Sequence, residues 1–196
     1  MTAPWMPSTA TPPADDVVSP ATVGAVAFDA LLRDGHARRV WGDLALATGA
    51  AATPAHRAAA LSALVPERAT VGRDAAAWVH TGADLPARVQ VLVGPRRRRP
   101  DPHPLRITHE CVLAEGDTVE LAGLRVTTVQ RTGLDIARWH GADSARNMLL
   151  TLCRVGFDPT AALHALAAIS GHAGVREART TLTALLAPAQ AAVRRG

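Results

Sequence analysis

The sequence predicts an α+β fold in which a β-rich middle is followed by a helical bundle at the C-terminal end. In the middle, Val89, Val91 and Val93 alternate with other residues, which is the pattern of a half-buried strand. From about residue 127 onward the apolar residues recur at helical spacing instead. The 196 residues are enough for one large domain or two small subdomains.

The chain begins with a segment that is not expected to fold. Residues 1–18 are rich in Pro, Ala and Thr and contain no basic residue, so a disordered tail is predicted. Order is expected to start at Ser19, a typical N-cap that is followed by Pro20 at the first helical position. The helix is predicted to run to about Arg33, where Gly35 suits its C-terminal cap.

A short β-hairpin is predicted after this helix. Residues 37–46 read as two short strands that turn at Gly42 and Asp43. A helix followed by a two-stranded hairpin is the closing half of a winged helix. Residues 19–52 are therefore predicted to form a truncated winged-helix-like segment.

The body of the protein is predicted over residues 53–187. Thr53 and the proline after it start a helix that ends before Pro66. A short strand near 69–71 leads into an alanine-rich helix, which stops near Gly82.

Four further strands are predicted in the middle of the chain, at 88–93, 105–108, 118–121 and 124–127. The first two are interpreted as a hairpin whose tip is the segment GPRRRRPDPHP. The last two form a tight hairpin around Gly123. A mixed or antiparallel β region is the result.

The rest of the chain is predicted to be helical. Thr127 and Gln130 fit a capping box for a helix that ends near Trp139. Three further helices are predicted at 143–155, 158–170 and 174–186, and residues 188–196 are predicted to form a terminal tail.

The basic residues are all of one kind. The chain has 21 arginines and no lysine, which excludes a Schiff base and a phosphate-loop lysine. The net charge is +4, and residues 33–196 alone carry 21 − 14 = +7. A basic body favours polyanionic partners. Aromatic residues are only 3%, which argues against stacking on single-stranded nucleic acid.

The strongest binding signal is the run Arg96, Arg97, Arg98 and Arg99 between two prolines. Prolines favour an extended backbone, so the guanidinium groups would point outward and contact DNA phosphates. A solvated loop is the alternative. Arg106 is expected to support these contacts. A second basic group at the end of the first helix and in the hairpin consists of Arg33, His36, Arg38 and Arg39.

Catalytic and metal chemistry find little support in the sequence. Asp101, His103, His109 and Cys111 are close together but lack the paired spacing of a metal site. No serine stands in a nucleophile elbow. We therefore expect a protein that is not an enzyme and uses no cofactor or metal. Carboxylates gathered near Asp101 and Glu110 would instead indicate a degenerate enzyme domain.

Two other expectations follow from local patterns. Arg131 and Asp135 are four residues apart on one predicted helix, where they can form an ion pair. The N-terminus lacks the features of a secretory signal, and the longest apolar stretch near it is too short to span a bilayer. A cytoplasmic protein without membrane association is expected.

Three stretches of the sequence resemble the AbiEi-type antitoxin family of type IV toxin–antitoxin pairs. They are residues 53–82, 88–128 and 130–139, and the similarity covers roughly residues 30–187. Its most recognisable elements are the Ala-Ala-Trp-x-His helix end at His80, the basic segment around Arg97, and the Arg-x-x-x-Asp pair.

This resemblance implies a transcriptional regulator that binds double-stranded DNA at its own promoter. It also implies counteraction of a partner toxin that resembles nucleotidyltransferases. Family members usually begin with a complete winged helix-turn-helix, whereas here a single helix precedes the hairpin. The alternative is an antitoxin that neutralises its toxin by direct contact through the C-terminal helices. A homodimer is compatible with either interpretation.

Overall fold

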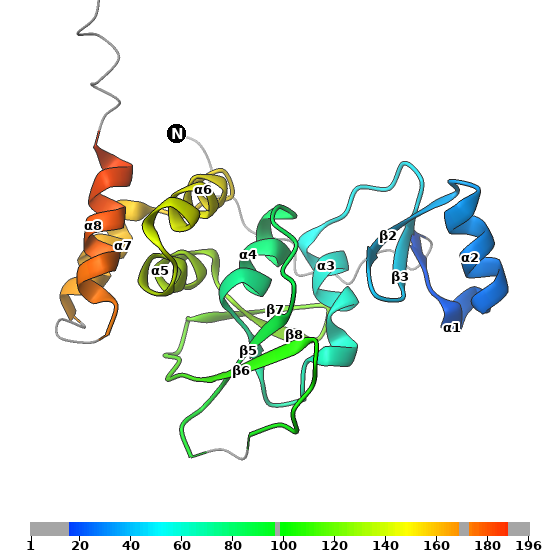
Figure 1. The fold of residues 1–196 in the computed structure, drawn as a ribbon, viewed down its shortest axis with the longest axis horizontal. Coiled ribbons are helices and arrows are strands. Elements are labelled where there is room, and N and C mark those ends of the chain that lie inside the picture. Colours follow the sequence, from blue (N-terminus) through cyan, green and yellow to red (C-terminus); the bar gives the residue numbers. More distant parts are fainter. Residues whose placement is uncertain (1–15, 97–98, 169–172, 188–196) are drawn as a thin grey trace, which may run out of the picture.

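The computed structural model describes residues 16–96, 99–168 and 173–187. Within them the fold is α+β with two separate sheets, as predicted. Figure 1 shows three parts in a row: a small N-terminal unit, a central sheet with two helices above it, and a group of four helices at the other end. Arg97, Arg98 and the predicted tails before residue 16 and after residue 187 lie outside the described residues.

The N-terminal unit combines two helices with a small antiparallel sheet. The sequence predicts one continuous helix, but the structure has two, because Gly24 breaks the chain with φ of 83°. The predicted tail is also wrong at its end, since Val17 and Val18 form a strand that pairs with Leu46 and Ala45. The elements are β1 (Val17–Val18), α1 (Pro20–Val23), α2 (Ala25–Arg33), β2 (Ala37–Trp41) and β3 (Leu44–Ala47), and the strand order is β1-β3-β2.

The central unit is built on a mixed five-stranded sheet. Its strand order is β6-β5-β4-β8-β7, in which β5 runs parallel to β6 and β4 runs parallel to β8. The elements are α3 (Pro54–Ala60), a 3₁₀ turn (Ser62–Leu64), β4 (Thr70–Val71), α4 (Arg73–Thr81), β5 (Val89–Val93), β6 (Arg106–Glu110), β7 (Thr118–Leu121) and β8 (Leu124–Thr127). The hairpin predicted around Gly123 is present as β7 and β8.

The hairpin predicted between β5 and β6 is wrong. These strands pair in parallel, with Val89 opposite Arg106 and Val93 opposite Glu110. A parallel pair requires a connection that returns along the strand, and about a dozen residues suffice for this. Residues 94–105 connect the two strands, and no helix is present in the described parts of this connection, 94–96 and 99–105. The arginine run therefore belongs to a crossover and not to a hairpin tip.

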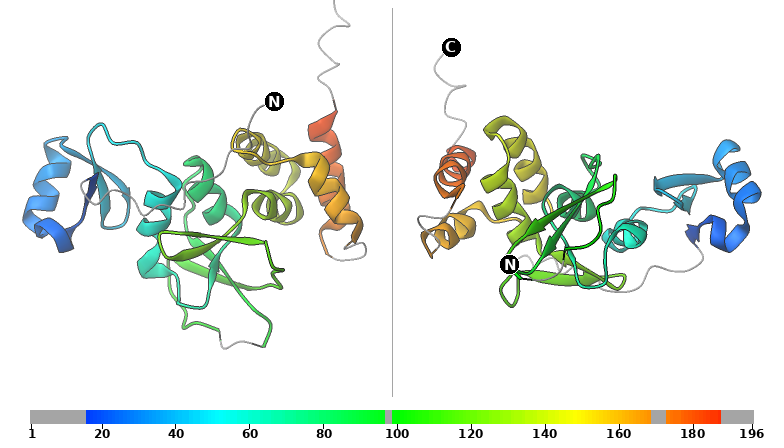
Figure 2. Two further views of the ribbon diagram at one scale, coloured as in Figure 1. Left: turned by 180° about the vertical axis from the view of Figure 1, so that it is seen from behind. Right: turned by 60° about the horizontal axis from the view of Figure 1, so that its bottom comes forward.

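One face of the central sheet is covered by α3 and α4 (Figures 1 and 2). The buried valines of β5 pack there with Ala75, Ala76 and Val79 of α4. Trp78, which is 4% exposed, is a core residue, and its ring lies 5.7 Å from that of Trp41 at the end of β2. This contact joins the N-terminal unit to the central core.

Arg57 is buried at the C-terminal end of α4. Its guanidinium donates hydrogen bonds to the carbonyl oxygens of Val79 (2.8 Å), Ala52 (2.6 Å) and His80 (3.2 Å). The last carbonyls of a helix have no intrahelical partner, so a cation placed there stabilises the helix end. Burial lowers the pKa of Arg57 to about 10, which leaves the group charged at neutral pH.

Four helices follow the central sheet: α5 (Val129–Trp139), α6 (Ala142–Cys153), α7 (Pro159–Ala168) and α8 (Val175–Leu186). Helix α5 begins one residue later than predicted, because Thr128 and not Thr127 is the N-cap and accepts from the amide of Arg131. Gly133 lets Phe157 approach closely, since a Cβ on this glycine would lie 2.3 Å from the ring. Among the described helices, none has both the length and the apolar character to cross a bilayer.

Candidate functional site

The arginine run is exposed at both of its described ends. Arg96 and Arg99 are exposed, and Arg96 has φ of 59°, which is uncommon for a residue with a side chain. Arg97 and Arg98 lie outside the described residues. The crossover therefore presents at least two guanidinium groups to solvent beside the end of β5.

Two further arginines lie beside the crossover, and the sequence did not single them out. Arg68 and Arg125 are exposed, and the Nη2 of Arg125 donates to the carbonyl oxygen of Arg68 at 3.0 Å. Two adjoining grooves of about 460 and 590 Å³ share Arg68, and Arg99 lines the first while Arg125 lines the second. We call Arg68, Arg96, Arg99 and Arg125 the basic rim.

Arg106 does not belong to this rim. It is half-buried, and its Nη1 donates to the carbonyl oxygen of Leu64 at 3.0 Å while its Nη2 donates to that of Asp101. These bonds tie β6 to the chain before β4 and to the crossover. Arg106 therefore has a structural role, and its Nη1 and Nη2 are already engaged by carbonyl oxygens that would compete with phosphate.

The arginines of the second basic group, Arg33, Arg38 and Arg39, are all exposed. Arg39 also contacts its own hairpin, where it donates to the carbonyl oxygen of Gly42, approaches Asp43 at 3.7 Å and lies 5.0 Å from the centre of the Phe28 ring. The hairpin therefore presents Arg38 more freely than Arg39.

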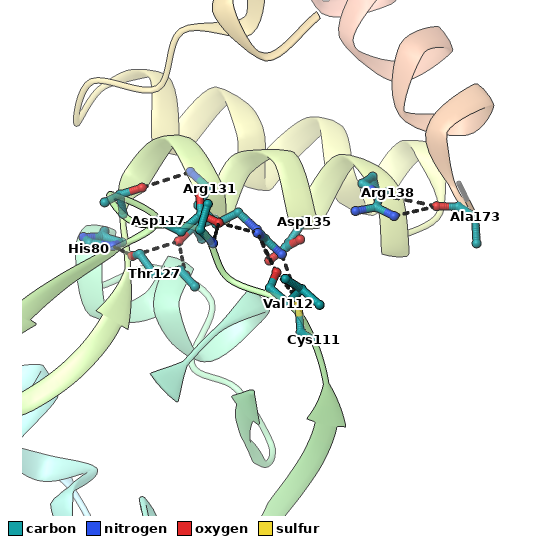
Figure 3. Close-up of polar contacts among 12 residues, drawn as sticks. His80, Cys111, Val112, Asp117, Thr127, Arg131, Asp135, Arg138 and Ala173 are labelled. Atoms are coloured by element: carbon teal, nitrogen blue, oxygen red, sulfur yellow. Dashed lines mark hydrogen bonds and ion pairs between the residues drawn. The ribbon is translucent and has the colours of Figure 1, made fainter. Parts of the chain in front are cut away.

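Arg131 lies at the centre of a cluster of polar side chains between α5 and the connection from β6 to β7 (Figure 3). Its Nε donates to Asp135 Oδ2 at 3.1 Å, which is the ion pair that the spacing predicts. Its Nη1 contacts Asp117 Oδ2 at 2.7 Å and its Nη2 contacts Cys111 Sγ at 2.9 Å. The i, i+4 spacing predicts Asp135, but nothing in the sequence indicates the two more distant partners.

Burial and the partner charges shift the pKa values of this cluster: burial outweighs the partner charge at Asp135, and the partner charges outweigh burial at Arg131. Asp135 is 2% exposed, and burial raises its pKa above the usual value although Arg131 opposes the shift. The same carboxylate and Cys111 help raise the pKa of Arg131, which stays charged. The cluster therefore ties α5 to the end of the sheet by a charged pair that excludes most of the solvent.

The cysteine and histidines that were weighed as metal ligands do not converge. Within the described residues, no group of three or more His, Cys, Asp or Glu side chains could hold a metal ion. Cys111 contacts the Arg131 guanidinium, and a positive charge there disfavours a metal cation.

A buried histidine links α4 to the end of β8. His80 is 2% exposed, and its Nε2 lies 2.7 Å from the carbonyl oxygen of Thr127, so Nε2 carries the proton and donates. Burial lowers the pKa of His80, and Nδ1 has no partner among the described residues. His80 is therefore a neutral structural residue at neutral pH.

The comparisons with known proteins leave the family open. No protein-family model matches the sequence, and no curated protein shows significant similarity to it. The resemblance to AbiEi-type antitoxins therefore supports a proposal and does not show the family.

Proposed function

We propose that this protein is a DNA-binding regulator without catalytic activity that acts as the antitoxin of a type IV toxin–antitoxin pair. The observation that carries the proposal is the basic rim: exposed Arg68, Arg99 and Arg125 line two adjoining grooves, and exposed Arg96 follows Pro95, which lines the second groove. The acidic side chains that line the same grooves are Glu67 and Asp101. A local excess of positive charge on an open surface favours a polyanion.

The lining of the grooves favours the backbone of double-stranded DNA over single strands. Among the described residues that line the two grooves there is no Phe or Trp, so this part of the chain offers unstacked bases no aromatic platform. Arginine guanidinium groups bind phosphates through paired N–H donors, and this contact does not depend on base sequence. The rim is therefore suited to phosphate contacts.

The N-terminal unit supplies a second contact surface in this proposal. Its helix pair and three-stranded sheet support a winged-helix-like role, with Arg33 and Arg38 on the DNA side. The exposed residues of α2 include Val26, which is 85% exposed, and Asp29. An acidic side chain and a valine are poor partners for most base edges, so we expect modest sequence discrimination.

The alternative function is a protein-binding antitoxin that neutralises a nucleotidyltransferase-like toxin directly. It is favoured by Leu150 on α6 and Leu186 on α8, which are 42% and 43% exposed. Large apolar side chains at the surface of the C-terminal helices suit a protein partner.

A mobility-shift titration at two salt concentrations tests the proposal, with duplex DNA from the region upstream of the gene. Four phosphate contacts give a slope of log affinity on log salt of roughly −3.6, at about −0.9 each. We expect the variant in which all four rim arginines are replaced by alanine to lose most of its affinity and to flatten this slope.

The matched control removes the same charge from a different surface. Arg146, Arg154, Arg176 and Arg179 are exposed on or beside α6 and α8, and alanine is tolerated well in helices. The control variant should bind DNA as the unchanged protein does. Equal losses in both variants would show that only net charge matters, and unchanged binding of the rim variant would reject the rim as the DNA contact. Loss of toxin binding in the control alone would favour the alternative.

A further inference from the structure

A cleft of about 520 Å³ lies between the start of α4, the connection after β6, and α5. Its apolar wall includes Leu92, Leu134 and Ala165. Several polar residues at its edge belong to the Arg131 cluster, and Figure 3 shows Arg131, Asp135 and Arg138 extending from α5. Charged side chains line it as well, namely the carboxylates Glu110, Asp117 and Asp135 and the arginines Arg73, Arg131 and Arg138. A concave site that combines an apolar wall with convergent polar groups is the usual form of a small-molecule site.

Arg73 is the arginine of this cleft whose donors are available. Arg131 is committed to Asp117, Asp135 and Cys111, and Arg138 donates to the carbonyl oxygen of Ala173 at 2.9 Å. Among the described residues, by contrast, no acceptor takes a hydrogen bond from the guanidinium of Arg73. This group lies 4.9 Å from the centre of the Trp139 ring.

The backbone of Arg73 supports a binding role. Its φ is 52°, a left-handed conformation that is costly for a residue with a long side chain. The side chain is half-buried, and burial lowers its pKa. The fold therefore holds an arginine in a strained and partly desolvated position, where its donors meet the cleft.

Asp135 provides a second unsatisfied group at the same place. Its Oδ2 accepts from Arg131, whereas its Oδ1 is buried and has no partner in the described part of the chain. A buried acceptor without a partner is rare in folded proteins and calls for a ligand or a water molecule. An N–H or O–H donor on a ligand would satisfy it.

We propose that this cleft binds a small organic anion with an apolar ring. Its carboxylate or phosphate pairs with Arg73, its ring contacts the apolar wall beside Trp139, and a ring N–H or O–H donates to Asp135 Oδ1. The proposal does not depend on DNA binding, because none of the basic-rim arginines lines this cleft.

Isothermal titration calorimetry of the full chain tests the proposal with three kinds of probe. The nucleoside monophosphates offer a phosphate with a ring donor, indole-3-acetate offers a carboxylate with a ring N–H, and inorganic phosphate offers the anion alone. We expect one of the organic probes to bind and inorganic phosphate to bind much more weakly. The probe that binds identifies the anion. Equal binding of inorganic phosphate, or no binding by any organic probe, would overturn the proposal.

Two variants locate the site by different means. Arg73→Asn removes the guanidinium and keeps a residue that tolerates the left-handed backbone. Ala165→Phe keeps every charge and fills the cleft. Both should weaken binding at least about tenfold, since a charge-assisted hydrogen bond or the space for the ring is lost. Arg146→Asn, at an exposed position of α6 outside both the cleft and the basic rim, is the matched control and should not change binding. If Arg73→Asn does not fold, Ala165→Phe alone decides, and unchanged affinity in it refutes the site.

Discussion

Replacing Arg131 by methionine is the most direct test of the buried ion pair. The variant leaves the Asp135 carboxylate in a site where it is 2% exposed and has lost the guanidinium that lay 3.1 Å away. Breaking a buried pair by removing one partner typically costs about 3–5 kcal/mol. The contact with Asp117, whose side chain is a quarter exposed, adds little. We expect a loss of about 3–4 kcal/mol, which lowers the Tm of a chain of this length by about 10 °C.

The pH dependence of this loss separates a charge effect from a packing effect. Without Arg131, burial raises the pKa of Asp135 further, so acid protonates the carboxyl and removes the penalty. Urea denaturation should therefore show a smaller deficit at pH 5 than at pH 7. Adding Asp135→Asn should restore part of the stability at pH 7, because the double variant buries no unpaired charge. A deficit independent of pH, or no rescue, would refute the account of the cluster.

Three further predictions concern buried groups elsewhere. Arg57→Met leaves three carbonyl oxygens without their donor and should lower the free energy of unfolding, measured in urea, by about 2–4 kcal/mol. The stability of Arg57→Lys should lie between those of Arg57→Met and the unchanged protein. An unchanged urea midpoint in Arg57→Met would show that the carbonyl oxygens find other partners. Gly133→Ala puts a Cβ 2.3 Å from the Phe157 ring and should lower the Tm by several degrees, at about 2–4 °C per kcal/mol of lost stability. The control is Gly141→Ala, whose new Cβ would have no atom within 4 Å and should have little effect on the Tm. Burial lowers the pKa of His80, so its contribution to stability is complete above pH 6.5 and is lost as the pH falls below that value, by at most about 1.4 kcal/mol per pH unit. Urea midpoints between pH 7.5 and 5.5 should depend less on pH in His80→Gln, and identical slopes would contradict this origin.

The local elements could be predicted because their signals are local. Proline at the first helical position marks the starts of α1, α3 and α7, and Ala122-Gly123 marks the turn between β7 and β8. The pairing of β5 with β6 could not be predicted in this way. Neighbouring strands often form hairpins, but a connection of twelve residues also allows a parallel crossover. The choice depends on packing against the rest of the sheet.

In the candidate sites too, contacts between residues close in sequence could be predicted, and contacts made by the fold could not. The pair of Arg131 and Asp135 follows from helical spacing, whereas Cys111 is twenty positions from Arg131 and meets it only through the fold. Arg68 and Arg125 are separated by 57 positions and come together because β4 and β8 are neighbours in the sheet. The structural role of Arg106 could not be predicted, because charge alone does not reveal that nearby carbonyl oxygens accept hydrogen bonds from its guanidinium.

The contact between Trp41 and Trp78 has a consequence for how the chain folds. The hydrophobic cluster of the N-terminal unit has Phe28, Ala37 and Ala45 as its buried residues, and units below about 40 residues rarely fold without further support. Trp41 packs against the larger core of the central unit, so part of the stability of the small sheet comes from a neighbour. Both units should therefore melt in a single cooperative transition, and a fragment that ends before α3 should not keep the native conformation of the small sheet.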